Sequence, residues 1–145
     1  MRVVIQNPLP GDDESAIISV KTVTERINRA VNLLKSPDDL TVYDADNQIF
    51  ILPVDAVFYA ESVDLKTFVY AEKAVYRSRM KLYEVEDILS AADFLRVSKQ
   101  IIVNVRKIRN ISPANNGRFA ARLTNGEIIT ISRQFVPALK ARFGL

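Results

Sequence analysis

Residues 94–108 read FLRVSKQIIVNVRKI, and residues 125–133 read NGEIITISR. Both stretches are mainly aliphatic, with single Arg, Lys, Ser, Gln or Asn residues where strands are expected to end. Short apolar runs bounded by such polar residues are typical of buried strands. The two stretches therefore predict a small β-rich domain that presents separate polar side chains to a polyanion.

Short strands are also predicted on both sides of this stretch. The expected strands cover residues 40–43, 48–52, 57–61, 67–71, 74–79, 94–97, 101–105, 107–111, 119–124 and 127–132. Asn125-Gly126 predicts a type I′ hairpin turn, which requires positive φ at both central residues. Apolar residues at helical spacing predict short helices over residues 82–90 and 134–142, with Phe135, Leu139 and Phe143 inward. The predicted fold class is mainly β, or α+β.

The first 39 residues are predicted to form a separate β-β-α extension ahead of a domain covering residues 40–145. Its strands are expected at residues 2–6 and 16–21, and Thr22 with Glu25 predicts a helix start through a capping box. An apolar helical stripe follows, made by Ile27, Ala30, Val31 and Leu34. The helix is expected to end at Ser36-Pro37, because the residue before proline avoids helical geometry. The extension is too short for a receiver domain of roughly a hundred residues, so no phosphoacceptor Asp is expected.

Charge is distributed unevenly along the chain, whose formal net charge is +3. Residues 1–76 hold seven Lys or Arg residues against twelve Asp or Glu, whereas residues 77–145 hold thirteen against five. A basic C-terminal half suggests a surface for phosphates or another polyanion. Charge alone does not decide between nucleic-acid binding and a solvated basic face.

Several classes of function are excluded or disfavoured by composition. The chain has no Cys and no His, so it has no disulfide, no thiolate metal site and no Cys or His catalytic group. We therefore expect no enzyme activity, no cofactor, no metal and no small-molecule substrate. No apolar stretch is long enough to span a membrane, and the N-terminus is unlike a signal peptide, so a cytoplasmic location is expected.

The order of motifs in the C-terminal two thirds resembles the LytTR family of bacterial DNA-binding domains. That family carries the pattern F-x-R-[VI]-[HS]-[RK]-S-x-[IL]-V-N-x-x-x-I, then L-x-[ND]-G, then a Ser-Arg pair that opens a final helix. The matching residues are Phe94, Arg96, Val97, Ser98, Lys99, Ile102, Val103, Asn104, Ile108, Leu123, Asn125, Gly126, Ser132 and Arg133. Two positions depart, because the frequent His is Ser98 and the frequent Ser is Gln100.

The resemblance implies a short, free-standing transcription regulator. The implied fold is an elongated stack of small antiparallel sheets with short helices, whose loops enter successive major grooves of duplex DNA and bend it. The implied partners are double-stranded DNA with repeated sites, a second copy of the chain on that DNA, and a membrane protein that sequesters the regulator. The extension is then a candidate dimer or regulatory surface.

Nine residues are predicted to contact DNA. They are Lys66, Thr67, Arg77, Arg79, Arg96, Ser98, Lys99, Gln100 and Arg133. The resemblance implies base contacts from Lys99, Arg133 and the Lys66-Thr67 loop. Chemically, Lys and Arg can donate to guanine O6 and N7, and Gln100 can pair with adenine. The other arginines suit phosphates, which position a protein without specifying sequence. Asn104 is expected to be structural, satisfying backbone groups near a turn.

Two other classes of function remain open from the residues alone. A protein-interaction module could use the same mixed surface without nucleic acid. A domain that binds RNA or single strands would need exposed aromatic side chains on a sheet face.

Overall fold

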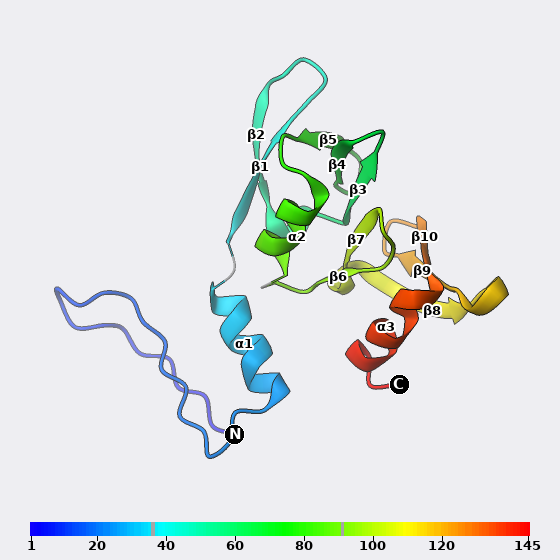
Figure 1. Cartoon of the computed structure of the whole chain (residues 1–145). Helices are drawn as coiled ribbons and strands as arrows, with labels where there is room; N and C mark the ends of the chain where they lie inside the picture. The colour runs from blue at the N-terminus through cyan, green and yellow to red at the C-terminus, as the bar shows by residue number, and fades with distance from the viewer. Residues whose placement is uncertain (36, 91) are drawn as a thin grey trace.

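The computed structural model describes residues 1–35, 37–90 and 92–145 (Figure 1). The helices are α1 (Glu25–Lys35), α2 (Leu82–Leu89) and α3 (Val136–Arg142). The strands are β1 (Asp39–Tyr43), β2 (Ile49–Pro53), β3 (Tyr59–Val63), β4 (Lys66–Tyr70), β5 (Val75–Ser78), β6 (Phe94–Arg96), β7 (Ile101–Asn104), β8 (Ile108–Pro113), β9 (Phe119–Leu123) and β10 (Ile128–Ile131). Short 3₁₀ turns lie between them, including η4 (Arg133–Phe135) just before α3.

The strands form two antiparallel sheets. The larger sheet has the order β2-β1-β5-β4-β3-β7-β6, and the smaller has the order β10-β9-β8. Neighbouring hairpins account for most of the pairs, while β3 with β7 and β1 with β5 join segments that are distant in sequence. The fold class predicted from the sequence, mainly β with short helices, is confirmed.

Alternate residues of strand β3 face two different cores. Ala60 lies opposite Val69 of β4 and Ile102 of β7, and all three belong to a core that is covered by α2. Tyr59 lies opposite Val103 and belongs to a second core, formed with the smaller sheet and α3. Successive side chains of a strand point to opposite faces, so one sheet supports both cores.

The second face of the larger sheet is uncovered over β2, β1 and β5. By register, Ile49, Ile51 and Val75 lie on the same face as Tyr59. Their side chains are 66%, 62% and 54% exposed, respectively. β2 is also an edge strand of the sheet, and the hairpin that it forms with β1 projects from the body (Figure 1).

The predicted strands at residues 2–6 and 16–21 are wrong. Residues 1–24 contain a turn and bends but no strand, and they loop away from the body (Figure 1). A β-branched run forms a strand only where it has a partner, and here side chains such as Val4 and Ile17 stay exposed.

Helix α1 forms close to the predicted position but starts differently. Thr24, not Thr22, caps it, because the Ile27 amide donates to Thr24 Oγ1 at 3.3 Å. Of the predicted stripe, Ile27 is buried, whereas Leu34 is 64% exposed. The predicted end at Ser36 lies outside the described residues. No helix in the described ranges is long and apolar enough to cross a membrane.

The type I′ turn predicted at Asn125-Gly126 is wrong, whereas the other Asn-Gly pair has this geometry. Asn116 and Gly117 have φ of 60° and 72°, as a two-residue turn of this type requires. At the predicted site only Gly126 has positive φ, and the Leu123 amide donates to the Glu127 carbonyl, so residues 124–126 form a three-residue loop. The sequence pair Asn-Gly is thus compatible with both backbone conformations, and the sequence alone does not distinguish them.

The last helix buries Leu139 as predicted, and Phe135 packs against the same core, but Phe143 does not turn inward. Val136 and Leu139 are buried in the second core, whereas Phe143 is 41% exposed. The helix ends at Arg142, so Phe143 lies at its C-cap and outside the helical stripe.

Candidate nucleic-acid interface

The hairpin of β3 and β4 closes through a two-residue turn. Val63 pairs with Lys66, so Asp64 and Leu65 alone make the turn, with φ of 50° and 65°. Lys66 is exposed at its base, whereas the neighbouring Thr67 is only 3% exposed. Of the two residues predicted in this loop, the structure presents the Lys66 side chain and buries Thr67.

The turn between β6 and β7 presents Lys99 and Gln100 at its tip, where both are exposed. Ser98 is 8% exposed, and its Oγ accepts a hydrogen bond from the Gln100 amide at 3.1 Å. The Val97 amide donates to the Ile101 carbonyl at 3.0 Å, which closes the turn. Ser98 thus occupies a structural position in the turn, and the two residues after it are the ones that face solvent.

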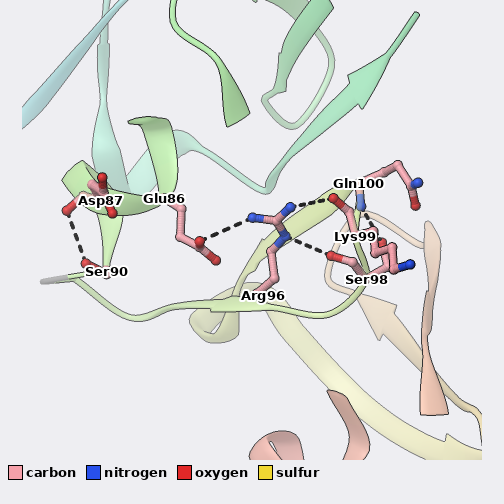
Figure 2. A network of polar contacts seen from close by, with 7 residues as sticks. All are labelled: Glu86, Asp87, Ser90, Arg96, Ser98, Lys99 and Gln100. Atoms are coloured by element: carbon pink, nitrogen blue, oxygen red, sulfur yellow. Dashed lines mark hydrogen bonds and ion pairs between the residues drawn. The ribbon is translucent and has the colours of Figure 1, made fainter. Parts of the chain in front are cut away.

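The Arg96 guanidinium hydrogen-bonds to the backbone of the same turn (Figure 2). Its Nε donates to the Ser98 carbonyl at 2.8 Å, and its Nη2 donates to the Lys99 carbonyl. Its Nη1 donates to Glu86 Oε1 of α2 at 3.2 Å, forming an ion pair whose two side chains are 24% and 35% exposed. All three guanidinium nitrogens are thus engaged within the protein, although sequence reasoning placed this arginine among the DNA contacts.

Arg133 is exposed at the start of η4. The amide of the preceding Ser132 donates to the Val97 carbonyl at 2.8 Å, which fixes the start of η4 beside the β6–β7 turn. The aliphatic stem of Arg133 passes over Gly117, where an added Cβ would approach Arg133 Cδ to 3.0 Å. The turn between β8 and β9 therefore favours glycine for its positive φ, and the Arg133 stem packs closely against it.

A further backbone bond joins the β3–β4 hairpin to these elements. The Ser62 amide donates to the Gln100 carbonyl at 2.8 Å. We call residues 62–67, 97–100 and 132–133 together the loop edge. Three segments that are far apart in sequence are brought together there, and each contributes one exposed cation, namely Lys66, Lys99 and Arg133.

Two hollows flank the tip of the β3–β4 hairpin. The first, of about 330 Å³, is lined by the cations Lys66, Arg77, Arg79 and Lys81. The second, of about 340 Å³, is lined by Lys81, Arg96 and Lys99. No carboxylate is among the described residues lining either hollow.

Three cations of the first hollow illustrate which residues sequence reasoning found and which it missed. Arg77 and Arg79 were predicted, and the Arg79 guanidinium lies over the Tyr43 ring at 4.1 Å, which restricts its position. Lys81 was not predicted, although it borders both hollows. The signal was the continued alternation of basic residues at positions 77, 79 and 81.

Asn104 is structural, as the sequence predicts. It is 2% exposed, its Nδ2 donates to the Val57 carbonyl at 2.9 Å, and its Oδ1 accepts from the Arg106 amide at 3.1 Å. The side chain therefore satisfies backbone groups at the end of β7 and is not available to a ligand.

The two stacked tyrosines of the larger sheet also belong to the core. The rings of Tyr59 and Tyr70 are 4.2 Å apart and nearly parallel. Burial raises the pKa of Tyr70 to about 12, helped by its hydrogen bond to Glu61, and burial likewise raises the pKa of Tyr59. These rings stack on each other and do not form an open platform for bases.

Comparison with known proteins places the chain in a family. The model for the LytTr DNA-binding domain matches residues 47–144. Over 116 residues the chain is 32% identical to the transcriptional regulatory protein YpdB of Escherichia coli K12, which covers 79% of this chain but 43% of that protein. The chain thus spans less than half the length of this curated relative.

A second relative is also named a transcriptional regulator, and a solved structure has the same fold. An HTH-type transcriptional regulator of Staphylococcus aureus (strain MRSA252) is 27% identical over 121 residues, covering 83% of this chain and 81% of that protein. The solved LytTr DNA-binding domain of a Bacillus cereus protein superposes with a TM-score of 0.70 at 28% identity, covering 76% of this chain and all of that one. The chain therefore belongs to the LytTr DNA-binding domain family of transcription regulators.

Proposed function

We propose that this chain regulates transcription by reading duplex DNA through the loop edge, whose loops enter successive major grooves. The observation that carries the proposal is the pair of backbone hydrogen bonds that join three cation-bearing loops, from Ser62 to Gln100 and from Ser132 to Val97. Rigidly joined loops keep their spacing when they meet a helical ligand, so less ordering entropy is lost on binding.

Base reading falls to the exposed residues of the loop edge. Lys99 and Arg133 can donate to guanine O6 and N7, and Gln100 can pair with the adenine N6 and N7 positions. Lys66, at the base of the β3–β4 hairpin, contacts DNA in the neighbouring major groove. Thr67 and Ser98 support these loops from within, since both are buried.

Phosphate contacts fall to the cations around the two hollows. Arg77, Arg79 and Lys81 border the first hollow without a lining carboxylate, so they present uncompensated positive charge. Such contacts fix the register of the protein on the duplex and carry no sequence information. In this proposal Arg96 positions the β6–β7 turn and does not itself read DNA.

The proposal is tested by separating base reading from positioning. Lys99→Ala and Arg133→Ala should each weaken binding to a duplex selected for affinity by about 1–3 kcal/mol, with a much smaller loss on random duplex. Arg109→Ala and Arg118→Ala, both at exposed positions, should weaken binding to the two duplexes alike if they touch phosphates.

Equilibrium titration of the four variants on both duplexes, and on the corresponding single strand, provides the measurement. Equal losses on selected and random duplex for Lys99→Ala and Arg133→Ala would show that these residues only position the protein. Tighter binding to the single strand than to the duplex would favour the alternative class of nucleic-acid ligand.

The extension and the DNA-binding domain are proposed to be separable, with residues 1–39 serving contact between two protomers on repeated sites or regulation by a membrane protein. Of the apolar side chains described on α1, Ile27 is buried, while Leu33 and Leu34 are exposed. The backbone of Asp38 already belongs to the domain, because its carbonyl accepts from the Val54 amide at 2.9 Å.

Deleting residues 1–37 should therefore leave a folded protein with unchanged affinity for a single site and reduced affinity for a double site. The reason is that both cores are built from residues after 39, whereas avidity on two sites depends on a contact between protomers. Circular dichroism and titrations on one-site and two-site duplexes measure the two effects. An unfolded product would place the extension in the core, and unchanged two-site affinity would remove its proposed role.

A further inference from the structure

Leu65 is an apolar side chain that the fold leaves entirely in solvent. It is 100% exposed and stands at the tip of the β3–β4 hairpin. Its φ is 65°, in the left-handed region that branched side chains rarely adopt. The preceding Asp64 also has positive φ, at 50°, but Asp is among the residues that tolerate this region.

The stability of the hairpin does not account for a leucine at this position. A two-residue turn with positive φ at both positions favours Asn or Gly in the second place. The Leu65 side chain also gains no burial, since no part of it is shielded from solvent. A residue that is costly to the backbone and contributes no packing points to a role outside the folded chain.

The surroundings of Leu65 indicate what that role is. Leu65 borders both hollows, whose charged lining residues are all Lys or Arg. Lys66 and Lys81 line the first hollow with it, and Lys81 and Lys99 line the second. The hairpin is held to the β6–β7 turn by the bond from Ser62 to Gln100, so its tip has a fixed place among these cations.

An apolar tip flanked by cations matches one feature of duplex DNA. Phosphates line the walls of the major groove, and the C5 methyl group of thymine is the apolar group that bases present on its floor. If the cations contact the phosphates on both walls, the tip of the β3–β4 hairpin lies between the walls and faces the floor of the major groove. We propose that Leu65 is a specificity-determining residue that packs against a thymine methyl group, an inference that rests on the proposed function.

The test combines variants of Leu65 with removal of the methyl group from DNA. Binding is titrated on a duplex selected with the wild-type protein, and on a series in which each thymine is replaced in turn by deoxyuridine. For the wild-type protein, one replacement should weaken binding about threefold to tenfold, the range expected for one buried methyl-sized group. Leu65→Ala should weaken binding to the unmodified duplex by the same factor. Its affinity should then not fall further when the critical thymine is replaced by deoxyuridine.

Three further variants serve as controls for this test. Leu65→Asn removes the apolar group with a residue that tolerates positive φ, so a loss matching that of Leu65→Ala excludes a distorted turn as its cause. Leu65→Met keeps an apolar tip and should retain sensitivity to the same deoxyuridine. Ile51→Ala changes an equally apolar, 62% exposed residue that lines neither hollow, and it should change neither affinity nor methyl dependence.

The outcomes separate this inference from the proposed function. If the wild-type protein binds the selected duplex tightly but no thymine methyl group depends on Leu65, the inference is overturned and the proposed function stands. The inference is also overturned if Leu65 variants bind DNA like the wild type, since the tip would then serve a protein partner. If the wild-type protein does not distinguish selected from random duplex, the proposed function itself fails.

Discussion

Affinity for duplex DNA is expected to fall on the order of a thousandfold when monovalent salt rises from about 50 to about 200 mM. Six cations surround the β3–β4 hairpin and the loop edge: Lys66, Arg77, Arg79, Lys81, Lys99 and Arg133. Within the described ranges none of the six forms an ion pair, so each is free to neutralise a phosphate. Released counterions then give a log–log slope with a magnitude on the order of 4 to 8.

Single substitutions calibrate this slope. Arg77→Gln should reduce its magnitude by about 1, because one phosphate contact disappears. Arg142→Gln is the matched control, since that guanidinium is already paired with Asp93 at 2.6 Å. Fluorescence anisotropy at a series of salt concentrations gives both slopes, and an affinity that stays flat between low and physiological salt would contradict the proposed electrostatic surface.

Arg96→Ala is expected to lower both the stability of the fold and its affinity for DNA, although Arg96 is assigned no contact with DNA. Removing the side chain breaks charge-assisted bonds to the Ser98 and Lys99 carbonyls and to Glu86, at a cost of about 1.5–3 kcal/mol in the free energy of unfolding. The released β6–β7 turn must then be ordered on binding, which should weaken affinity about tenfold.

Two further variants distinguish positioning from direct contact. Glu86→Gln removes the ion pair but leaves the bonds to the turn, so its effects should be smaller than those of Arg96→Ala. Arg26→Ala removes an exposed cation from α1 and should change neither quantity. Chemical denaturation and DNA titration measure the pair of effects. A salt slope that drops by a full unit in Arg96→Ala, with stability intact, would identify Arg96 as a phosphate contact instead.

The elements that were predicted well are those whose signals are local. Alternation of apolar residues and closely spaced turn residues place the hairpins of β1 with β2 and of β9 with β10, because both strands and their turn lie within one short window. The motif from Phe94 to Ile108 likewise predicts β6, β7 and the family, because its residues lie in one continuous stretch of sequence.

The elements that were missed depend on distant partners. Residues 2–6 have the composition of a strand but have no partner strand in the described structure. Nothing in the sequence around residues 2–6 indicates that a partner is missing. Arg96 reads as one more surface cation until Glu86 on α2 and the carbonyls of the turn are brought beside it. Leu65 reads as an ordinary loop residue until the register from Val63 to Lys66 forces it into the tip of a two-residue turn.

The edge strand β2, which pairs only with β1 in the described structure, affects the solubility of the protein. Residues 48–54 carry no charge, and the unpaired edge of β2 exposes backbone donors and acceptors beside Ile49 and Ile51. Charged residues and interior prolines normally discourage aggregation at such an edge, but the one proline of β2 is its last residue, Pro53. Solubility at high concentration therefore depends less on the net charge of +3 than on what covers this single strand.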